Sequence, residues 1–197
     1  MNRLVSLSGI VLALGAAASA SAGITIASSQ VAYQAALEGR GFLSESFTGA
    51  ALNEPAGGAG WNSWSADAPG GLYLMGGVLS TAVADDALTI SFGSGQVGAV
   101  GGIFYLTNAN RSIVVGSLIE IALDNGEQYV SESSSTNFAG FIADPGQTIS
   151  SITIKPLIPG GDAPYAAVSE LIVSGVPAPG SLALLGAAGL AARRKRR

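Results

Sequence analysis

The two tryptophans of this chain stand three residues apart in a segment rich in Gly, Pro, Asn and Ser. Residues 55–71 read PAGGAGWNSWSADAPGG. An exposed indole stacks on the apolar face of a sugar ring, while amide and carboxylate groups bind its hydroxyls. The segment therefore predicts a glycan contact through Trp61, Asn62, Trp64 and Asp67. The same residues allow a second interpretation, in which one or both indoles close the end of a β-sandwich.

Acidic side chains are the other groups that could do chemistry, because the chain contains 0 His and 0 Cys. This composition excludes a Ser-His-Asp triad, imidazole and thiolate zinc sites, and a thiol nucleophile. Two facing carboxyl groups are sufficient for glycoside hydrolysis, and the candidates are Asp85, Asp86, Glu120 and Glu132. None of them stands in a catalytic motif, and carboxylates on turns are commonly just solvated. We therefore expect a protein that is not an enzyme.

Calcium is the cofactor that the acidic residues would suit, since Ca²⁺ prefers hard oxygen ligands. The candidate ligands lie in predicted turns and loops: Asp85 with Asp86, Asp124 with Glu127, and Asp144 or Asp162. Their spacing matches neither an EF-hand nor a calcium-binding nonapeptide repeat. Solvated loop carboxylates are the alternative interpretation, so the sequence defines no metal site.

The first 22 residues have the features of a secretory signal peptide. Arg3 supplies the positive start, residues 4–18 form the apolar region, and the small residues Ala20 and Ala22 mark a signal-peptidase site with cleavage after Ala22. An uncleaved N-terminal anchor is the alternative. We expect signal peptidase to be a partner and the rest of the chain to be exported through the inner membrane.

Residues 176–197 have the features of a second membrane-directed segment. Val176, Pro177, Ala178 and Pro179 precede an apolar run of about 14 residues, roughly 21 Å of helix against a hydrocarbon layer of about 30 Å. The basic residues that follow are Arg193, Arg194, Lys195, Arg196 and Arg197, which would stay on the cytoplasmic side and stop transfer. The alternative is a core helix followed by a basic nucleic-acid-binding tail.

The order of these features resembles the PEP-CTERM sorting signal, which is also known as the ice-binding-protein C-terminal motif. The resemblance covers the Val-Pro-x-Pro break, the short Leu-Leu-Gly-x-x-Gly-Leu run and the basic cluster. Ala178 stands where the family usually has Glu. The resemblance implies brief anchorage by a short transmembrane helix, cleavage by an exosortase-like membrane protease, and delivery to the cell surface, outer envelope or extracellular matrix.

The segment between these two ends is strongly acidic. It contains Arg40, Arg111 and Lys155 against 13 Asp+Glu, a net charge of −10. Such a surface repels nucleic acid, which we exclude as a partner, and without cysteine the segment has no disulfides. About 150 residues are enough for one domain, which we place at residues 23–175.

That domain is predicted to be mainly β, with one short helix at residues 30–38. Ser29 would cap the helix, Gly39 would end it, and Val31, Ala35 and Leu37 would face the body of the domain. Strands are predicted at residues 24–26, 43–47, 72–75, 78–83, 88–92, 97–106, 117–123, 127–132, 138–142, 149–154 and 168–173. The residues Asp124-Asn125-Gly126 predict a tight hairpin, and residues 149–154 alternate apolar with polar. Many short strands without a βαβ rhythm predict an antiparallel β-sandwich.

The order of helix, Gly-rich strand, Asn-Gly hairpin and Phe-Ala-Gly-Phe strand is also similar to the jelly-roll domains that often precede PEP-CTERM tails. We thus expect an exported envelope or matrix protein whose sandwich has a structural or adhesive role. The alternative is a carbohydrate- or calcium-binding module, whose partner would be extracellular polysaccharide. A carboxylate-dependent glycoside hydrolase is the third function considered.

Overall fold

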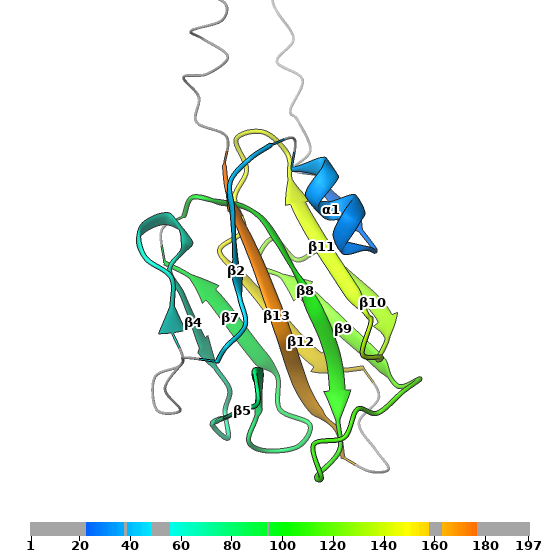
Figure 1. Cartoon of the computed structure of the whole chain (residues 1–197). Helices are drawn as coiled ribbons and strands as arrows, with labels where there is room; N and C mark the ends of the chain where they lie inside the picture. Colours follow the sequence, from blue (N-terminus) through cyan, green and yellow to red (C-terminus); the bar gives the residue numbers. More distant parts are fainter. Residues whose placement is uncertain (1–22, 38, 49–55, 94, 158–162, 177–197) are drawn as a thin grey trace, which may run out of the picture.

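The computed structural model of the chain describes residues 23–37, 39–48, 56–93, 95–157 and 163–176. Two antiparallel sheets pack face to face, and one short helix lies on the outer side of one of them (Figure 1). The prediction of a mainly β, antiparallel sandwich with one early helix is therefore confirmed.

The seven-stranded sheet is built around its two longest strands, which pair with each other. In pairing order it contains β1 (Ile24–Ala27), β11 (Phe138–Ala143), β8 (Val97–Thr107), β13 (Tyr165–Gly175), β6 (Val78–Thr81) and β5 (Leu72–Met75), and β2 (Phe42–Glu45) also pairs with β13. A β-bulge between Val168 and Glu170 changes the alternation of β13. As a result, Ala167 and Glu170 both lie on the outer face, although they are an odd number of positions, three, apart.

The six-stranded sheet forms the second layer. In pairing order it contains β10 (Gln128–Glu132), β9 (Leu118–Leu123), β12 (Ser151–Pro156), β7 (Leu88–Phe92), β4 (Trp64–Asp67) and β3 (Ala56–Gly57). Strand β12 alternates as the sequence predicted, with Ile152 and Ile154 buried between the sheets and Thr153 and Lys155 on the outer face. This alternation is what lets a sheet cover the core with one face and meet water with the other.

The β9–β10 hairpin forms at the predicted turn. The amide of Gly126 donates to the carbonyl of Leu123 over 3.0 Å, and Leu123 donates back to Glu127 over 2.9 Å. Gly126 has φ of +90°, a left-handed conformation that glycine adopts without a steric penalty.

Helix α1 (Gln30–Ala36) begins where the sequence predicted, and the Ser29 hydroxyl accepts a hydrogen bond from the Ala32 amide over 3.2 Å. The predicted buried face was wrong in part. Leu37 is buried, but Val31 is 79% exposed and Tyr33 is the buried helical residue. The ring of Tyr33 packs closely on the outer face of the sheet. Gly140 of β11 and Gly101 of β8 lie opposite each other there and, having no side chains, leave room for the ring.

Two short strands and one helical turn were not predicted from the sequence. They are β3, β4 and the 3₁₀ turn η1 (Gly60–Asn62), which together occupy the tryptophan segment. Elsewhere the predicted strands occur within a few residues of their expected ends, and the largest difference is β13, which begins at Tyr165 instead of residue 168. Pairing with β8 extends this strand, because Tyr165 lies opposite Thr107.

The two ends of the described domain lie at the same end of the sandwich (Figure 1). Thr25 pairs with Ile142, which pairs with Ala99, and Ala99 in turn pairs with Ser174. Tyr165, at the start of β13, lies at the opposite end, about 30 Å away at roughly 3.3 Å per residue. No helix among the described residues is both long and apolar enough to cross a membrane.

Candidate functional site

Trp64 lies in the hydrophobic core, and Trp61 packs against the edge of that core. Trp64 is 3% exposed and meets Phe47 edge to face, with the ring centroids 5.3 Å apart. Trp61 is partly buried over Gly175, where an added Cβ would lie 3.3 Å from the indole. The ring of Trp64 is therefore not exposed for contact with a sugar. This agrees with the second interpretation of the segment, in which one or both indoles close the end of the β-sandwich.

The polar neighbours of the tryptophans do not gather around an exposed ring. The side-chain oxygen of Asn62 accepts a hydrogen bond from the Ala59 amide over 2.9 Å and closes the η1 turn. Asp67 is exposed at the end of β4, on the outer face of the six-stranded sheet. Strand alternation explains this arrangement, because Trp64 and Asp67 lie on opposite faces of β4.

The acidic residues considered for hydrolysis do not meet across a cleft in the described part of the chain. Glu120 on β9 is 6% exposed and forms an ion pair with Lys155 at 2.9 Å. Glu132 ends β10 and is exposed, whereas Asp85 and Asp86 lie in the turn between β6 and β7. Glu120, Glu132 and the turn that carries Asp85 and Asp86 thus lie in three different parts of the fold. The Glu120 carboxylate is already paired with Lys155.

The residues considered for calcium are likewise separate. Asp86 accepts a hydrogen bond from the Gly70 amide over 2.7 Å, and Asp124 accepts one from the Ser150 hydroxyl. Asp85 lies beside Asp86, Glu127 follows the hairpin turn, and Asp144 is on another loop. No three acidic residues come together as a metal site in the ranges that the structure describes. Asp162 lies outside those ranges.

The sorting residues of the sequence analysis are outside the described part of the chain, with one exception. Val176 is described, and its amide donates to the carbonyl of Gln96 over 2.8 Å. The residues outside are Ala20, Ala22, Pro177, Ala178, Pro179 and the basic cluster at 193–197.

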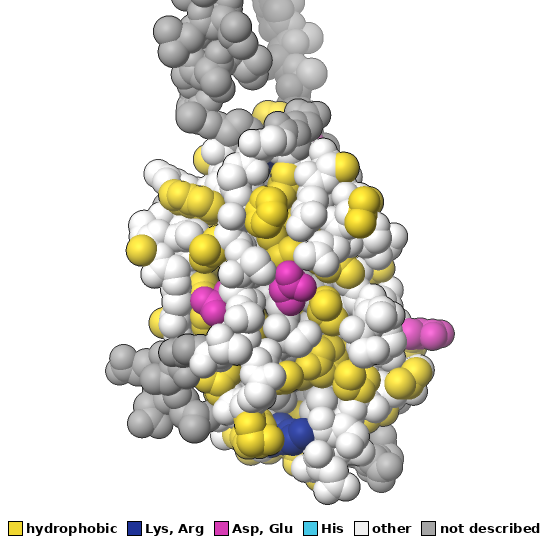
Figure 2. Space-filling model, viewed as in Figure 1, with side chains coloured by type: hydrophobic (Ala, Val, Ile, Leu, Met, Phe, Trp, Pro, Cys, Tyr) yellow, Lys and Arg dark blue, Asp and Glu magenta, His cyan; other side chains and the backbone are white. Residues whose placement is uncertain are grey.

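A cluster that the sequence analysis did not single out lies on the outer face of the seven-stranded sheet. The guanidinium carbon of Arg111 lies 4.0 Å from the ring centroid of Tyr73 and 4.3 Å from that of Tyr165. All three side chains are half-buried. In the same view as Figure 1, a basic patch at the lower end of this face lies beside hydrophobic side chains (Figure 2). We call these three residues the Arg111 cluster.

Four segments position the Arg111 cluster. Tyr73 comes from β5, Tyr165 from the start of β13, and Arg111 from the loop between β8 and β9. Ser80 of β6 completes it, because Ser80 pairs with Tyr73 on one side and with Ala167 on the other. The sheet register thereby places both tyrosines on the outer face, on either side of the guanidinium.

The loop that carries Arg111 is closed by Asn108. The side-chain oxygen of Asn108 accepts hydrogen bonds from the amides of Asn110 and Ser112, over 2.9 and 3.0 Å. The Arg111 amide donates to the carbonyl of Asn108 over 2.8 Å. Arg111 has φ of +63°, a conformation that costs a non-glycine residue roughly 1 kcal/mol or more and persists only where surrounding contacts maintain it.

Hydrogen bonds fix one end of the guanidinium. Nη1 of Arg111 donates to the hydroxyl of Ser80 over 3.2 Å and to the carbonyl of Thr81 over 3.0 Å. Both bonds come from the same nitrogen, which carries two hydrogens. Nε and Nη2 have no hydrogen-bond partner among the described residues, and Arg111 as a whole is half-buried. The cluster therefore presents aromatic surface together with unused, oriented donors.

The outer face continues along β13 from Tyr165 to Glu170. Tyr105 lies between them on β8; burial raises the pKa of its phenol, and a hydrogen bond with the Ser169 side chain lowers it in part. Glu170 accepts hydrogen bonds through Oε1 from Gln30 and Ser44, each over 3.1 Å. The face thus carries donors at the Arg111 end and a carboxylate acceptor further along.

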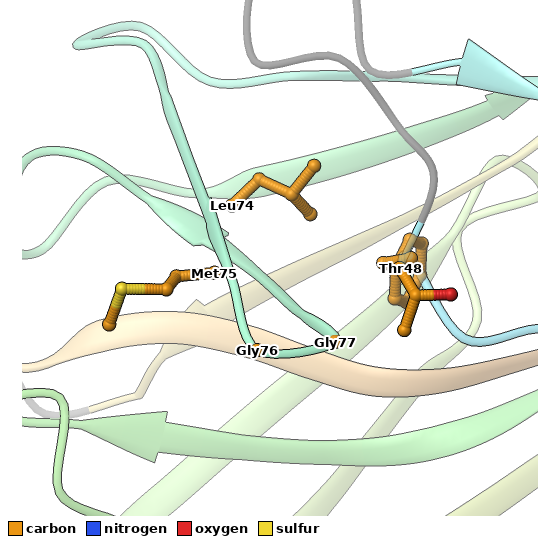
Figure 3. Close-up of a pocket in the computed structure, with 6 residues that line it drawn as sticks. Thr48, Leu74, Met75, Gly76 and Gly77 are labelled. Carbon is orange, nitrogen blue, oxygen red and sulfur yellow. The ribbon is translucent and has the colours of Figure 1, made fainter.

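A small pocket lies beside the Arg111 cluster, behind the β5–β6 turn. It has a volume of about 240 Å³ and is lined by Phe47, Thr48, Leu74, Met75, Gly76 and Gly77. In Figure 3, Leu74 points toward Thr48, whereas Met75 points the other way. The sulfur of Met75 accepts a hydrogen bond from the Tyr73 hydroxyl over 3.2 Å. None of these six residues is ionisable as an acid or base near neutral pH, so the pocket offers no acid–base chemistry.

The comparisons with known proteins concern the fold. No protein-family model matches the chain. No curated protein matches it either. Among solved structures, a family 29 carbohydrate-binding module is similar at a TM-score of 0.39 and 14% identity, over 69% of this chain and 90% of that one.

Two further solved structures show similar levels of likeness. A family two carbohydrate esterase from Cellvibrio japonicus aligns at a TM-score of 0.40 and 10% identity, over 71% of this chain, which spans 35% of the esterase. A family 11 carbohydrate-binding module of the cellulosomal cellulase Lic26A-Cel5E of Clostridium thermocellum aligns at 0.28 and 13%, over 71% of this chain and 98% of that one. We take neither a ligand nor an activity from these likenesses. The chain's own fold and site define an antiparallel β-sandwich with an aromatic and guanidinium contact surface.

Proposed function

We propose that this protein is an exported carbohydrate-binding β-sandwich of the cell envelope or extracellular matrix, and that it binds its ligand at the Arg111 cluster. The observation that carries the proposal is the guanidinium held between the rings of Tyr73 and Tyr165 on an open sheet face. This is the binding alternative of the sequence analysis, moved from the tryptophan segment to the opposite end of the sandwich.

The chemistry of the Arg111 cluster suits a sugar. Pyranose rings have apolar faces that pack on aromatic side chains, and their hydroxyls need oriented hydrogen-bonding groups around those contacts. The tyrosine rings and the 62%-exposed Met75 supply the apolar part. Nε and Nη2 of Arg111 supply donors. The proposal includes no hydrolysis, because the acidic residues described above do not form a facing pair in a cleft.

The position of the Arg111 cluster also suits a protein that is tethered during sorting. The two ends of the domain lie at one end of the sandwich, and the cluster lies at the other. A domain held to a membrane through residues 176–197 would therefore direct the cluster away from that membrane. A structural or adhesive role in the matrix would then be performed by binding polysaccharide.

A binding experiment with matched variants tests the proposal. Full-length protein is purified in a detergent without a sugar head group and titrated against a panel of soluble neutral and acidic polysaccharides. We expect Tyr165→Ala and Tyr73→Ala to weaken binding about 2- to 10-fold, since an aromatic contact contributes roughly 0.5–1.5 kcal/mol beyond the area that it buries. Phe42→Ala is the control, because Phe42 is a 48%-exposed aromatic residue on β2 of the same sheet, outside the cluster. Wild-type protein that binds no polysaccharide in the panel would refute the proposal.

The sorting part of the proposal rests on the two ends of the sequence and has its own test. Intact-mass measurement of protein from the native host should show loss of residues 1–22 and of the segment that begins near Val176. A mature protein that still contains Arg193 to Arg197 would contradict cleavage by an exosortase-like protease. Restoring the usual family residue with Ala178→Glu should leave the cleavage product unchanged or increase its yield.

A further inference from the structure

We propose that the carbohydrate recognised at the Arg111 cluster bears a carboxylate, as a uronic acid does, and that Nε and Nη2 of Arg111 bind this carboxylate in a bidentate manner. This inference rests on the proposed function and adds the chemical class of the ligand.

The first argument is the geometry of the guanidinium. Nη1 donates to Ser80 and Thr81, so the edge of the guanidinium that does not include Nη1 is the one formed by Nε and Nη2. This edge presents two parallel N–H groups, which match the two oxygens of a carboxylate. A hydroxyl of a neutral sugar would use only one of the two donors at a time.

The second argument is that Arg111 forms no ion pair with a carboxylate among the described residues. Three basic residues lie in the described part of the chain, and Lys155 forms an ion pair with Glu120 there. Arg40 differs again, because its Nη1 is buried without a hydrogen-bond partner. Within the described part of the chain, the partners of Arg111 are aromatic rings, a hydroxyl and a carbonyl, and none of these neutralises its charge. Although the acidic domain as a whole repels anions, this arrangement leaves a charged donor edge at which one carboxylate of a ligand can bind.

The third argument is pre-organisation. A flexible arginine loses side-chain entropy when it binds an anion, which weakens the complex. Arg111 is already held by two rings and two hydrogen bonds, and its backbone is held by the Asn108 turn. The entropy of ordering this side chain is therefore lost on folding and not on binding. The two rings also lie within 4.3 Å of the guanidinium carbon and lower the polarity of its surroundings, which strengthens its interaction with an anion.

The experiment compares one polymer with and without its charge. Full-length protein is titrated with polygalacturonate and with the same polymer after methyl esterification, which keeps the sugar rings and removes the carboxylate charge. Dextran sulfate serves as a second anion without a carboxylate. The protein variants are Arg111→Gln, Arg111→Lys and Lys155→Gln, and thermal unfolding of each shows that it is folded at the titration temperature.

We expect wild-type protein to bind polygalacturonate at least about 10-fold more tightly than the esterified polymer, because a charge-assisted bidentate contact contributes roughly 1.5–3 kcal/mol. Arg111→Gln should remove this preference. Arg111→Lys should lose most of it, since lysine keeps the charge but has no planar pair of donors. Lys155→Gln removes the same unit of charge from the outer face of the other sheet and should leave binding within about twofold.

The outcomes separate this inference from the proposed function. Equal binding of the charged and esterified polymers, with loss of both in Tyr165→Ala, would overturn the carboxylate assignment and leave carbohydrate binding intact. Tighter binding of dextran sulfate than of polygalacturonate would also overturn it, in favour of charge alone. If Arg111→Gln and Lys155→Gln weaken binding equally, the contact is net charge and not the Arg111 edge, and the inference fails.

Discussion

Gly140 of β11 lies directly beneath the ring of Tyr33 of α1, so that a Cβ at Gly140 would come within 2.3 Å of Tyr33 Cδ2. Tyr33 is fully buried and packs beside Phe138, with ring centroids 5.6 Å apart. The contact fixes α1 on the outer face of the seven-stranded sheet. It leaves the Tyr165 end of the same face free of the helix (Figure 1).

This relationship predicts that Gly140→Ala destabilises the protein. The added methyl group must displace the Tyr33 ring, and overpacking of this kind costs about 1–3 kcal/mol. Urea unfolding measures the loss. Gly41→Ala is the control, because a Cβ at Gly41 meets no atom within 4 Å and its φ is not in the left-handed region. Equal effects of the two substitutions would contradict the close packing of Gly140 and Tyr33.

Tyr33 should also make stability depend on alkaline pH. Burial raises the pKa of its phenol, and the nearby charge of Arg40 lowers it in part. Unfolded tyrosine ionises near pH 10 while the folded residue keeps its proton, so the unfolded state binds fewer protons above that pH. The free energy of unfolding should therefore fall by about 1.4 kcal/mol per pH unit above pH 10 because of this residue.

The variant Tyr33→Phe removes that contribution. Its stability relative to wild type should rise as pH increases from 9 to 11.5 in urea titrations, whereas between pH 6 and 9 the difference should stay constant. A pH-independent difference over the whole range would show that Tyr33 ionises as readily in the folded protein as in the unfolded chain.

Substitution of Trp64 should affect stability and not ligand binding. Trp64→Ala removes a 3%-exposed side chain from between the sheets and should cost about 3–5 kcal/mol. Trp64→Phe should cost much less, because it keeps an aromatic ring beside Phe47 and removes an indole N–H that is buried without a hydrogen-bond partner in the described structure. Folded Trp64→Phe that loses polysaccharide binding would return the site to the tryptophan segment.

The Glu120–Lys155 pair predicts an asymmetry between two substitutions. Lys155→Gln leaves the carboxylate of Glu120, a 6%-exposed residue, without its cation. The free energy of unfolding should fall by roughly 1–2 kcal/mol. The loss is smaller than for a fully buried pair because the Lys155 side chain is 43% exposed. Adding Glu120→Gln to Lys155→Gln should recover part of this loss, since no unpaired charge remains. Thermal unfolding at low and high salt measures the stability of the single and double variants. If the losses from Lys155→Gln and Glu120→Gln simply add in the double variant, the two residues do not interact.

Local sequence signals were sufficient for much of the fold. The alternation of residues 149–154, the Asn125-Gly126 turn and the Ser29 cap each depend on neighbours a few residues away, and each is found as predicted. The face of α1 was predicted incorrectly. Helical periodicity favoured Val31, but only the facing glycines of β8 and β11 determine that Tyr33 is buried.

The candidate site likewise could not be predicted from local sequence signals. In the sequence, Tyr73, Arg111 and Tyr165 are separated by 38 and 54 residues, and no motif connects them. Their juxtaposition depends on β13 pairing with both β6 and β8, which is long-range register. The two tryptophans are close in sequence and have many polar neighbours, but the alternation of β4 places Trp64 in the core, and Trp61 is partly buried against it.

By itself the sequence determined the class of fold, the acidic character of the domain and the absence of histidine and cysteine chemistry. These follow from composition and from patterns shorter than one hairpin. Tertiary structure alone decided which aromatic residues are exposed and which cation has an unused edge. The physical reason is that burial and hydrogen-bond satisfaction are set by strands paired across more than 50 residues, and such pairing leaves no local signal in the chain.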